Sequence, residues 1–239
     1  MEAVYREYVP ATGLRAVVAC TWEQVPAEDL LQRVVPDACV DLIWLAGREL
    51  VIAGPDTSAR DVALAAGTRT SGIRIRPGAA GAVLGLPASE LRDQEVAAQD
   101  VWGAEATRLQ QAVAAVSHER RAALLSAAVA SRQATPDGLV VAAARLLARP
   151  GARVETVADE LGVSTRTLHR RTVAAVGYRP KVLARVARLR RLMSLQEPSL
   201  AQRAYVAGYS SQAHMNEEVR RLTGATPVRF LKDAPPAAA

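Results

Sequence analysis

The stretch VADELGVSTRTLHRRTVAAVG, residues 157–177, is followed by a second stretch of the same outline, RAYVAGYSSQAHMNEEVRRLTG, residues 203–224. In each, an alanine precedes a glycine by four positions, and a serine then opens a second amphipathic run. The aligned residues, 46 positions apart, are Ala158 with Ala204, Gly162 with Gly208, and Ser164 with Ser210. This order is typical of a helix-turn-helix, whose second helix can enter a DNA groove. Two in tandem predict a DNA-binding regulator rather than an enzyme.

Charge is distributed unevenly along the 239 residues. Residues 137–239 contain 17 Lys and Arg against 8 Asp and Glu, whereas residues 1–136 contain 13 against 16. A basic segment joined to a mildly acidic one suits a DNA-binding domain attached to a domain with another task. An arginine-rich composition also arises from a GC-rich genome. The basic charge supports DNA binding because it coincides with the helix-turn-helix repeat.

Composition excludes several other classes. No long apolar run and no basic-then-apolar leader is found, which predicts a soluble, cytoplasmic protein. Cys20 and Cys39 are too few for a disulfide framework, and the three scattered histidines have no zinc-site spacing. We also find no nucleophile–base pair and no phosphate loop, so neither catalysis nor a cofactor or metal is expected.

An α+β fold is predicted, with residues 1–102 as a β-rich domain. Apolar runs between turn formers predict strands at 14–20, 40–45, 50–53 and 73–75. Alternation over 73–76 puts two isoleucines on one face and Arg74 and Arg76 on the other. Residues 103–133 have helical spacing and predict two bridging helices that are candidates for dimerisation. The short linker near 134–138 predicts that the two halves pack closely.

Residues 137–232 are expected to be entirely helical. The predicted helices cover 139–147, 154–161, 164–176, 180–195, 200–207, 211–222 and 227–231. The long, arginine-rich helix at 180–195 would join the two helix-turn-helix units. The tail at 233–239 is expected to be disordered.

Four ordered motifs in the last hundred residues resemble the AraC/XylS family of bacterial transcription regulators. They are ADELGVSTRTLHRR (158–171), GYRPK (177–181), AGYSSQAH (207–214) and RRLTGATP (220–227). The resemblance implies two helix-turn-helix units on a rigid central helix, each offering a recognition helix to adjacent major-groove segments. It implies double-stranded DNA as partner, and it leaves open RNA polymerase, a small-molecule effector and a second copy of the chain.

The first hundred residues resemble a small sensor-type domain that precedes this helix-turn-helix pair in many actinobacterial regulators. The motifs are PDACVDLIW (36–44), AGPD (53–56), GIRIRPGAA (72–80) and LPASEL (86–91). The resemblance implies a β-rich, cupin-like core and does not identify a ligand.

Candidate DNA contacts follow from helix periodicity and from the family motif. In the first unit Leu168 should face the core, which turns Thr165, Arg166, His169 and Arg170 outward. Arginine can pair with guanine O6 and N7. In the second unit the matching surface carries Gln212, Ala213, Asn216 and Glu217, and its amides suit adenine. His214 and Met215 are expected on the packed or flanking face. For Arg166, His169 and Arg170, the alternative interpretation is an ordinary solvated helix face.

Six further arginines are expected to position the protein on phosphates without reading sequence. They are Arg185, Arg188, Arg190, Arg191, Arg220 and Arg221. For any one of them, solubilising charge is an equally good interpretation.

The chain departs from the family pattern within both recognition helices. Thr172 stands where the first helix ordinarily buries a phenylalanine, and Met215 and Val219 stand at the corresponding places in the second. A buried threonine brings a hydroxyl that needs a partner. Glu217 replaces a usual arginine and would repel phosphate, although it could accept from cytosine N4. We therefore expect the first unit to dominate affinity; an alternative is an interaction protein whose DNA binding has weakened.

The effector site, if there is one, is expected among charged residues of the N-terminal motifs. The candidates are Asp37, Asp41, Arg74, Arg76 and Trp44. One hypothesis is that Arg74 or Arg76 pairs an anionic ligand; the alternative is ordinary ion pairs at strand ends. Trp44 could line a cavity or fill the core, and filling is the commoner case.

Overall fold

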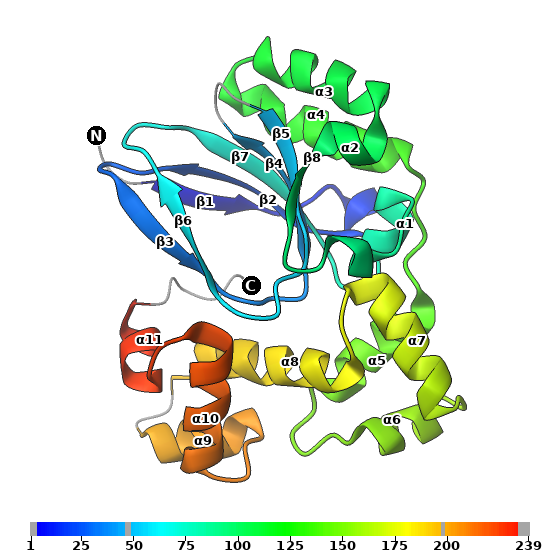
Figure 1. Ribbon diagram of the computed structural model, residues 1–239, viewed down its shortest axis with the longest axis vertical. Helices are drawn as coiled ribbons and strands as arrows, with labels where there is room; N and C mark the ends of the chain where they lie inside the picture. Colours follow the sequence, from blue (N-terminus) through cyan, green and yellow to red (C-terminus); the bar gives the residue numbers. More distant parts are fainter. Residues whose placement is uncertain (1–3, 46–48, 197–198, 234–239) are drawn as a thin grey trace.

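The computed structural model describes residues 4–45, 49–196 and 199–233. Figure 1 shows a β-sheet domain above an all-helical half. Within the described residues, six strands form an antiparallel sheet in the order β1-β2-β7-β4-β5-β8, and β3 pairs with β6 as a separate ribbon. The strands are β1 (Val4–Tyr8), β2 (Val18–Val25), β3 (Leu30–Val34), β4 (Val40–Leu45), β5 (Glu49–Ala53), β6 (Arg60–Leu64), β7 (Thr70–Ile75) and β8 (Glu95–Ala97).

The two faces of the six-stranded sheet have different surroundings. Ile73 and Ile75 are fully buried against helices α3 (Ala104–Ala114) and α4 (His118–Ser131), which add Val113 and Leu125 to the same core. Arg74 lies between the two isoleucines on β7 and points to the opposite face, as its alternation predicts. In Figure 1 the β3–β6 ribbon curves away on the side opposite α3 and α4. The shorter elements of this half are η1 (Thr12–Leu14), α1 (Ala80–Leu84), η2 (Ala88–Leu91) and α2 (Ala98–Trp102).

Some expectations for this half need correction. The predicted strand at 14–20 is wrong in its first part, because Leu14 ends the turn of η1 and pairing begins only at Val18. The helices expected to bridge the halves instead pack their apolar side chains onto the sheet, so they complete the N-terminal core. The strand at 40–45 is confirmed with both its ends, and the predicted strands at 50–53 and 73–75 lie within β5 and β7.

The helical half matches the predicted helices to within one or two residues. Its elements are α5 (Gly138–Leu147), α6 (Val154–Glu160), α7 (Thr165–Val176), α8 (Pro180–Ser194), α9 (Leu200–Ala207), α10 (Gln212–Thr223) and α11 (Pro227–Asp233). Ser164, Ser199 and Ser211 cap α7, α9 and α10, each accepting a backbone N–H from the residue three positions on. Pro180 begins α8, where its fixed φ favours the first helical turn. Residues 234–239 of the expected disordered tail lie outside the described residues.

Both helix-turn-helix units share one hydrophobic core, to which Leu168 of α7, Met215 of α10 and Phe230 of α11 contribute. Ala38, from the loop before β4, is buried in this same core. The two halves are therefore in direct contact, as the short linker predicts.

Candidate DNA-binding interface

In the first helix-turn-helix unit, α6 and α7 are joined by a short turn in which Gly162 has a φ of 66°. The Ser164 hydroxyl accepts from the Thr167 N–H at 3.1 Å and fixes the start of α7. Leu168 is fully buried, so the prediction that it faces the core is confirmed. The side chains that this rotation leaves exposed are Thr165, Arg166, His169 and Arg170.

Arg166 and Arg170 make no ion pair within the described part of the chain. They lie one helical turn apart on the exposed face of α7, so both guanidinium groups are available to a partner. Arg171, the next residue, has a different role. It forms a bidentate pair with Asp137, with Nε at 2.8 Å from Oδ2, and so ties α7 to the start of α5.

Thr172 has the partner that its burial demands. The residue is fully buried, and its hydroxyl donates to the Leu168 carbonyl oxygen at 2.7 Å, one turn earlier in the same helix. The substitution of a polar residue at this core position therefore leaves no orphaned hydroxyl.

In the second unit the capping serine lies three positions after the turn glycine, Gly208, rather than two as in the first unit. Ser211, rather than the aligned Ser210, accepts from a backbone N–H and caps α10. Ser210 instead contacts His214 Nδ1 through its backbone N–H at 3.3 Å and its hydroxyl at 3.0 Å. Met215 is fully buried and His214 is half-buried, which confirms their expected place on the packed face.

The opposite face of α10 is polar rather than basic. Gln212, Ala213 and Glu217 are exposed, and Asn216 is half-buried. Glu217 Oε1 lies 3.6 Å from Arg221 Nη2, and both side chains are more than half exposed. Solvent screens such a pair strongly, so Arg221 can still turn to another anion.

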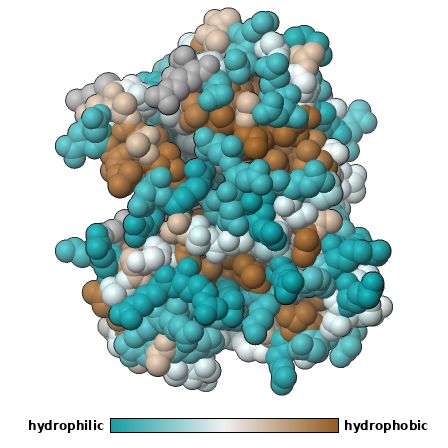
Figure 2. Space-filling model, in the orientation of Figure 1, coloured by the Kyte–Doolittle hydropathy of each residue, from teal (hydrophilic) through white to brown (hydrophobic). Residues whose placement is uncertain are grey.

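The expected phosphate-binding arginines fall into two groups. Arg190, Arg191, Arg220 and Arg221 are exposed. Arg185 and Arg188 are a correction, because the structure turns both inward from α8 onto the Glu218 carboxylate of α10. The buried Glu218 carboxylate pairs with both guanidinium groups, so both positive charges point into the fold and not toward phosphates. Figure 2 shows the surface of the helical half as mostly hydrophilic.

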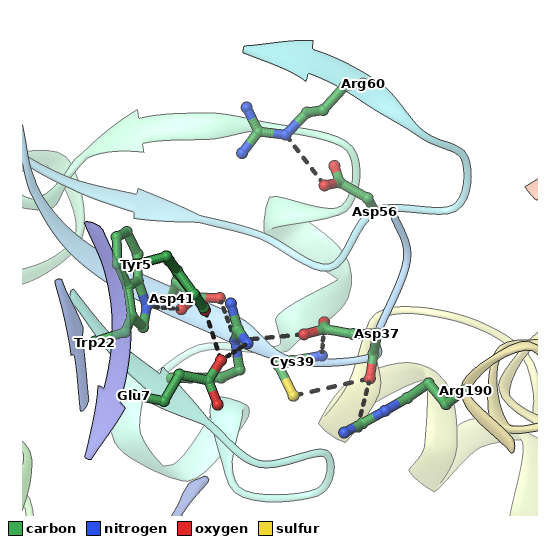
Figure 3. A network of polar contacts seen from close by, with 10 residues as sticks. Tyr5, Glu7, Trp22, Asp37, Cys39, Asp41, Asp56, Arg60 and Arg190 are labelled. Atoms are coloured by element: carbon green, nitrogen blue, oxygen red, sulfur yellow. Dashed lines mark hydrogen bonds and ion pairs between the residues drawn. The ribbon is translucent and has the colours of Figure 1, made fainter. Parts of the chain in front are cut away.

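Three of the five N-terminal candidates, Asp37, Asp41 and Arg74, meet in one polar cluster. Figure 3 shows Asp37 and Asp41 in this cluster, together with Glu7 and Trp22. Arg74 Nε lies 3.2 Å from Asp41 and 3.4 Å from Asp37, and its Nη1 lies 3.3 Å from Glu7. Trp22 Nε1 donates to Asp41 at 2.7 Å. Burial raises the pKa of the Asp41 carboxyl, although the Arg74 charge opposes that shift. Three carboxyl groups thus surround one guanidinium, and the predicted pairing of Arg74 with an anionic ligand would meet excess negative charge.

Arg76 and Trp44 lie apart from this cluster. Arg76 Nε donates to the carbonyl oxygens of Arg15 and Val18, at 2.9 and 3.0 Å. Trp44 is buried in the core on the helix-covered face, where the Arg121 guanidinium lies 5.9 Å from its ring centre. Trp44 therefore fills the core and does not meet Asp37, Asp41 or Arg74.

Residues 157–233 match a family described as a helix-turn-helix domain. These residues form a helix-turn-helix domain of the AraC type. The helix-turn-helix domain is that of a DNA-binding transcription regulator. Residues 6–97 match a domain of unknown function, DUF6597. The DUF6597 match ends at β8, ahead of the helices α2 to α4 that complete its core.

Crystal structures of ToxT from Vibrio cholerae resemble the whole chain at low similarity. The structure from strain O395 has a TM-score of 0.45 and 10% identity, covering 91% of this chain and 98% of ToxT. The P21 crystal form has a TM-score of 0.47 and 10% identity, covering 95% and 98%. Among curated proteins, none matches this sequence. In the described residues, no helix has both the length and the apolarity to cross a membrane.

Proposed function

We propose that the chain recognises specific DNA sequences through the exposed faces of α7 and α10, and that the N-terminal domain adjusts how these helices are held. The observation that carries the first part is the pair of exposed guanidinium groups, Arg166 and Arg170, on the outer face of α7. Arginine forms bidentate hydrogen bonds with guanine in the major groove. His169 and Thr165 lie on the same face and complete the proposed base-contacting set with Arg166 and Arg170.

The second recognition helix is proposed to contribute less affinity than the first. Gln212 and Asn216 offer amides suited to adenine, and Ala213 offers a methyl group to thymine. Glu217 brings a negative charge to a surface that must approach phosphates. Phosphate contacts are proposed for the four exposed arginines at positions 190, 191, 220 and 221, which would position the duplex without reading its sequence.

The N-terminal domain is well placed to influence the first unit, because it packs against the end of α7. Gly177 has a φ of 90°, and a Cβ there would collide with Pro55 and lie 3.2 Å from the Ala88 carbonyl oxygen. The backbone N–H of Asp137, the capping residue of α5, donates to Gly78 at 2.9 Å. The C-terminal end of α7 thus lies against Pro55, after β5, and Ala88 of η2, and the start of α5 is also joined to the sheet domain.

The second unit is held by the ribbon. At the carboxyl end of α10 the Leu222 carbonyl oxygen accepts from the Ala59 N–H at 2.7 Å. The Thr223 carbonyl oxygen accepts from Arg33 Nη1 at 3.4 Å. These carbonyl groups have no partner within the helix, and a cation there also suits the helix dipole. A movement of β3 or β6 would therefore act directly on the second recognition helix.

Asp37 connects the charged cluster of the sheet to the central helix. Its carboxylate lies against Arg74, and its carbonyl oxygen accepts from Arg190 Nη1 at 3.4 Å (Figure 3). We propose that an effector acts at Asp37, Asp41 and Arg74, and that a ligand with a positively charged group suits the surplus of carboxylates there. RNA polymerase and a second copy of the chain are further proposed partners, because regulators of this family suggest them. The proposed location of the protein is the cytoplasm.

The second candidate function is a protein-interaction regulator with weakened DNA binding. Exposed Glu217 favours it, whereas Thr172 gives it little support because the threonine hydroxyl is satisfied. Selection of duplexes from a randomised pool, followed by titration at several salt concentrations, separates the two. We expect a selected sequence and a steep fall of affinity with salt, with a slope of about −0.9 per phosphate contact. Failure to enrich any sequence would favour the second candidate.

A matched pair of arginines tests the coupling between the halves. Arg33 and Arg60 both lie on the ribbon and both pair with an aspartate, but only Arg33 also reaches α10. We expect Arg33→Gln to weaken binding to the selected duplex by about threefold to tenfold, since one hydrogen bond to a charged group is lost. Arg60→Gln should leave affinity unchanged. Equal effects of the two substitutions would contradict the proposed coupling through the ribbon.

A further inference from the structure

Glu218 is a buried carboxylate on the second recognition helix. The residue is 7% exposed, between the exposed Glu217 and the buried Val219. Glutamate is almost never buried unless it is paired, because an isolated ion loses its hydration. The environment of this side chain therefore calls for a specific set of partners.

Two arginines of the central helix supply the opposite charge. Arg188 Nη2 lies 2.8 Å from Oε1 and 2.9 Å from Oε2 of Glu218, and its Nε lies 3.2 Å from Oε2. Arg185 Nε lies 3.2 Å from Oε1. Residues 185 and 188 are neighbours on one face of α8. The carboxylate thus joins α10 to two successive points of the helix that connects both units.

A histidine links the same carboxylate to the beginning of α10. His214 Nε2 lies 3.2 Å from Glu218 Oε1, while its Nδ1 accepts from the Ser210 backbone N–H at 3.3 Å. With Nδ1 accepting from Ser210, Nε2 is the ring atom that donates toward the Glu218 carboxylate. Tyr209 packs edge-on against His214 and under Arg188, with the Arg188 guanidinium 5.6 Å from its ring centre. The turn, α8 and α10 therefore meet at Glu218.

The cluster lies on the side of α10 away from the proposed base contacts. At about 100° per residue, Glu218 is rotated by about 200° from Asn216 and by about 240° from Gln212. Fixing Glu218 against α8 consequently fixes the direction in which Gln212 and Asn216 point. An apolar residue would fill the same space, but it would leave Arg185 and Arg188 without a counter-charge.

We infer that Glu218 is a positioning residue of the second recognition helix. Its carboxylate sets the rotation of α10 through Arg185, Arg188 and His214, and it withdraws these two arginines from the phosphate backbone. This inference rests on the proposed DNA recognition by α10. The rotation of that helix about its own axis is thus assigned to a buried charge, while the ribbon holds its carboxyl end.

The test compares Glu218→Gln with Glu28→Gln, which removes the same charge from an exposed loop of the sheet domain, outside the proposed DNA-binding surface. The probe is the duplex selected by the unmodified protein. The part of this duplex that α10 covers is identified first, as the part whose protection is weakened by Gln212→Ala. We expect Glu218→Gln to lower affinity about tenfold, as expected for losing a base contact, and to abolish hydroxyl-radical protection only over the α10 part. Glu28→Gln should keep that protection. Unchanged protection, or equal loss over both parts in a folded variant, would overturn the inference.

Amide hydrogen exchange of the free protein gives a second measurement that needs no DNA. Glu218→Gln should speed exchange in α10 at least about tenfold more than in α7, because opening of α10 becomes easier locally. Equal acceleration in both helices, or none, would overturn the inference even if DNA is bound. If the unmodified protein selects no duplex while exchange rises only in α10, the proposed recognition fails and the positioning role stands.

If circular dichroism shows that Glu218→Gln is unfolded, Arg185→Gln replaces it, since this change removes only the single contact at 3.2 Å. A smaller loss confined to the α10 part supports the positioning role. A loss spread over both parts, or no change, overturns it.

Discussion

The two recognition helices have the same outline in sequence but are held and exposed differently. α7 presents Arg166 and Arg170 and is fixed by close backbone approach at Gly177. α10 presents amides and Glu217, and it is fixed by the buried carboxylate of Glu218 and by the ribbon at its end. A repeated motif therefore predicts the geometry of two helices, whereas the surroundings of each helix decide how it can be used.

The largest expected effect is on DNA affinity, and it compares the outer faces of α7 and α10. Replacing both Arg166 and Arg170 with alanine should weaken binding to the selected duplex by about 100-fold or more, since each bidentate guanine contact is worth about 1–3 kcal/mol. Fluorescence anisotropy of a labelled duplex at fixed salt measures the change. Gln212→Ala with Asn216→Ala is the matched pair on α10, with an expected loss of about tenfold or less.

A greater loss from the α10 pair than from the α7 pair would reverse the proposed ranking of the two units. Thermal unfolding of both double variants serves as the control, because all four side chains lie on the outer faces of their helices and their removal should leave the core intact.

A smaller effect concerns the anchoring of α7. Burial acts to raise the pKa of the Asp137 carboxyl, but its hydrogen bonds from Arg171 and Val140 outweigh this and lower the pKa. Because the pKa is lower in the folded state than in the unfolded state, the ionised carboxyl stabilises the fold above the unfolded-state pKa. This stabilisation is lost as the pH falls through the folded-state pKa. Asp137→Ala should lower the unfolding free energy by about 1–2 kcal/mol near pH 7.

Thermal denaturation across pH measures the Asp137 effect. The gap between Asp137→Ala and the unmodified protein should narrow as the carboxyl becomes protonated below its usual range. Asp137→Asn keeps the cap but not the charge and should fall between the two. A gap that is constant with pH would show that the ion pair with Arg171 contributes nothing.

The smallest expected effect is a gain. Glu217→Arg removes the exposed negative charge of α10, releases Arg221 and adds a cation. Affinity should rise about threefold to tenfold, and the salt slope should steepen by about 1–2 phosphate contacts. Glu28→Arg, the same change in charge on an exposed loop of the sheet domain, should have little effect. A sharp drop with Glu217→Arg would identify the carboxylate as a specific reader of cytosine.

Local patterns were sufficient to predict the helical half. Glycines, capping serines and Pro180 mark helix ends. Helical periodicity predicts that the side of α7 that carries Leu168 is buried. The alignment of the two units does not identify the cap of α10, because Ser210 aligns with Ser164 but the adjacent Ser211 caps the helix.

Long-range contacts were beyond such patterns. The pairing of β3 with β6 joins segments thirty residues apart, and neither strand has strong alternation. From the sequence alone, Arg185 and Arg188 cannot be told from surface arginines. Only the fold shows that α10 brings Glu218 against them. The adjacent pair Glu217 and Glu218 gave a partial signal, because in a helix two consecutive residues cannot share one face. Arg33 and Glu7 carried no signal before the fold was known.

The shared boundary between the two halves limits how such regulators can exchange parts. Ala38 completes the helical core, and Ala59 and Arg33 terminate α10 from outside it. A chimera that joins a foreign sensory module at the linker near residue 135 would forfeit all three. Transplanting the DNA-reading half into another regulator therefore requires grafting the end of β3, the loop as far as Ala38 and the residue before β6 along with it.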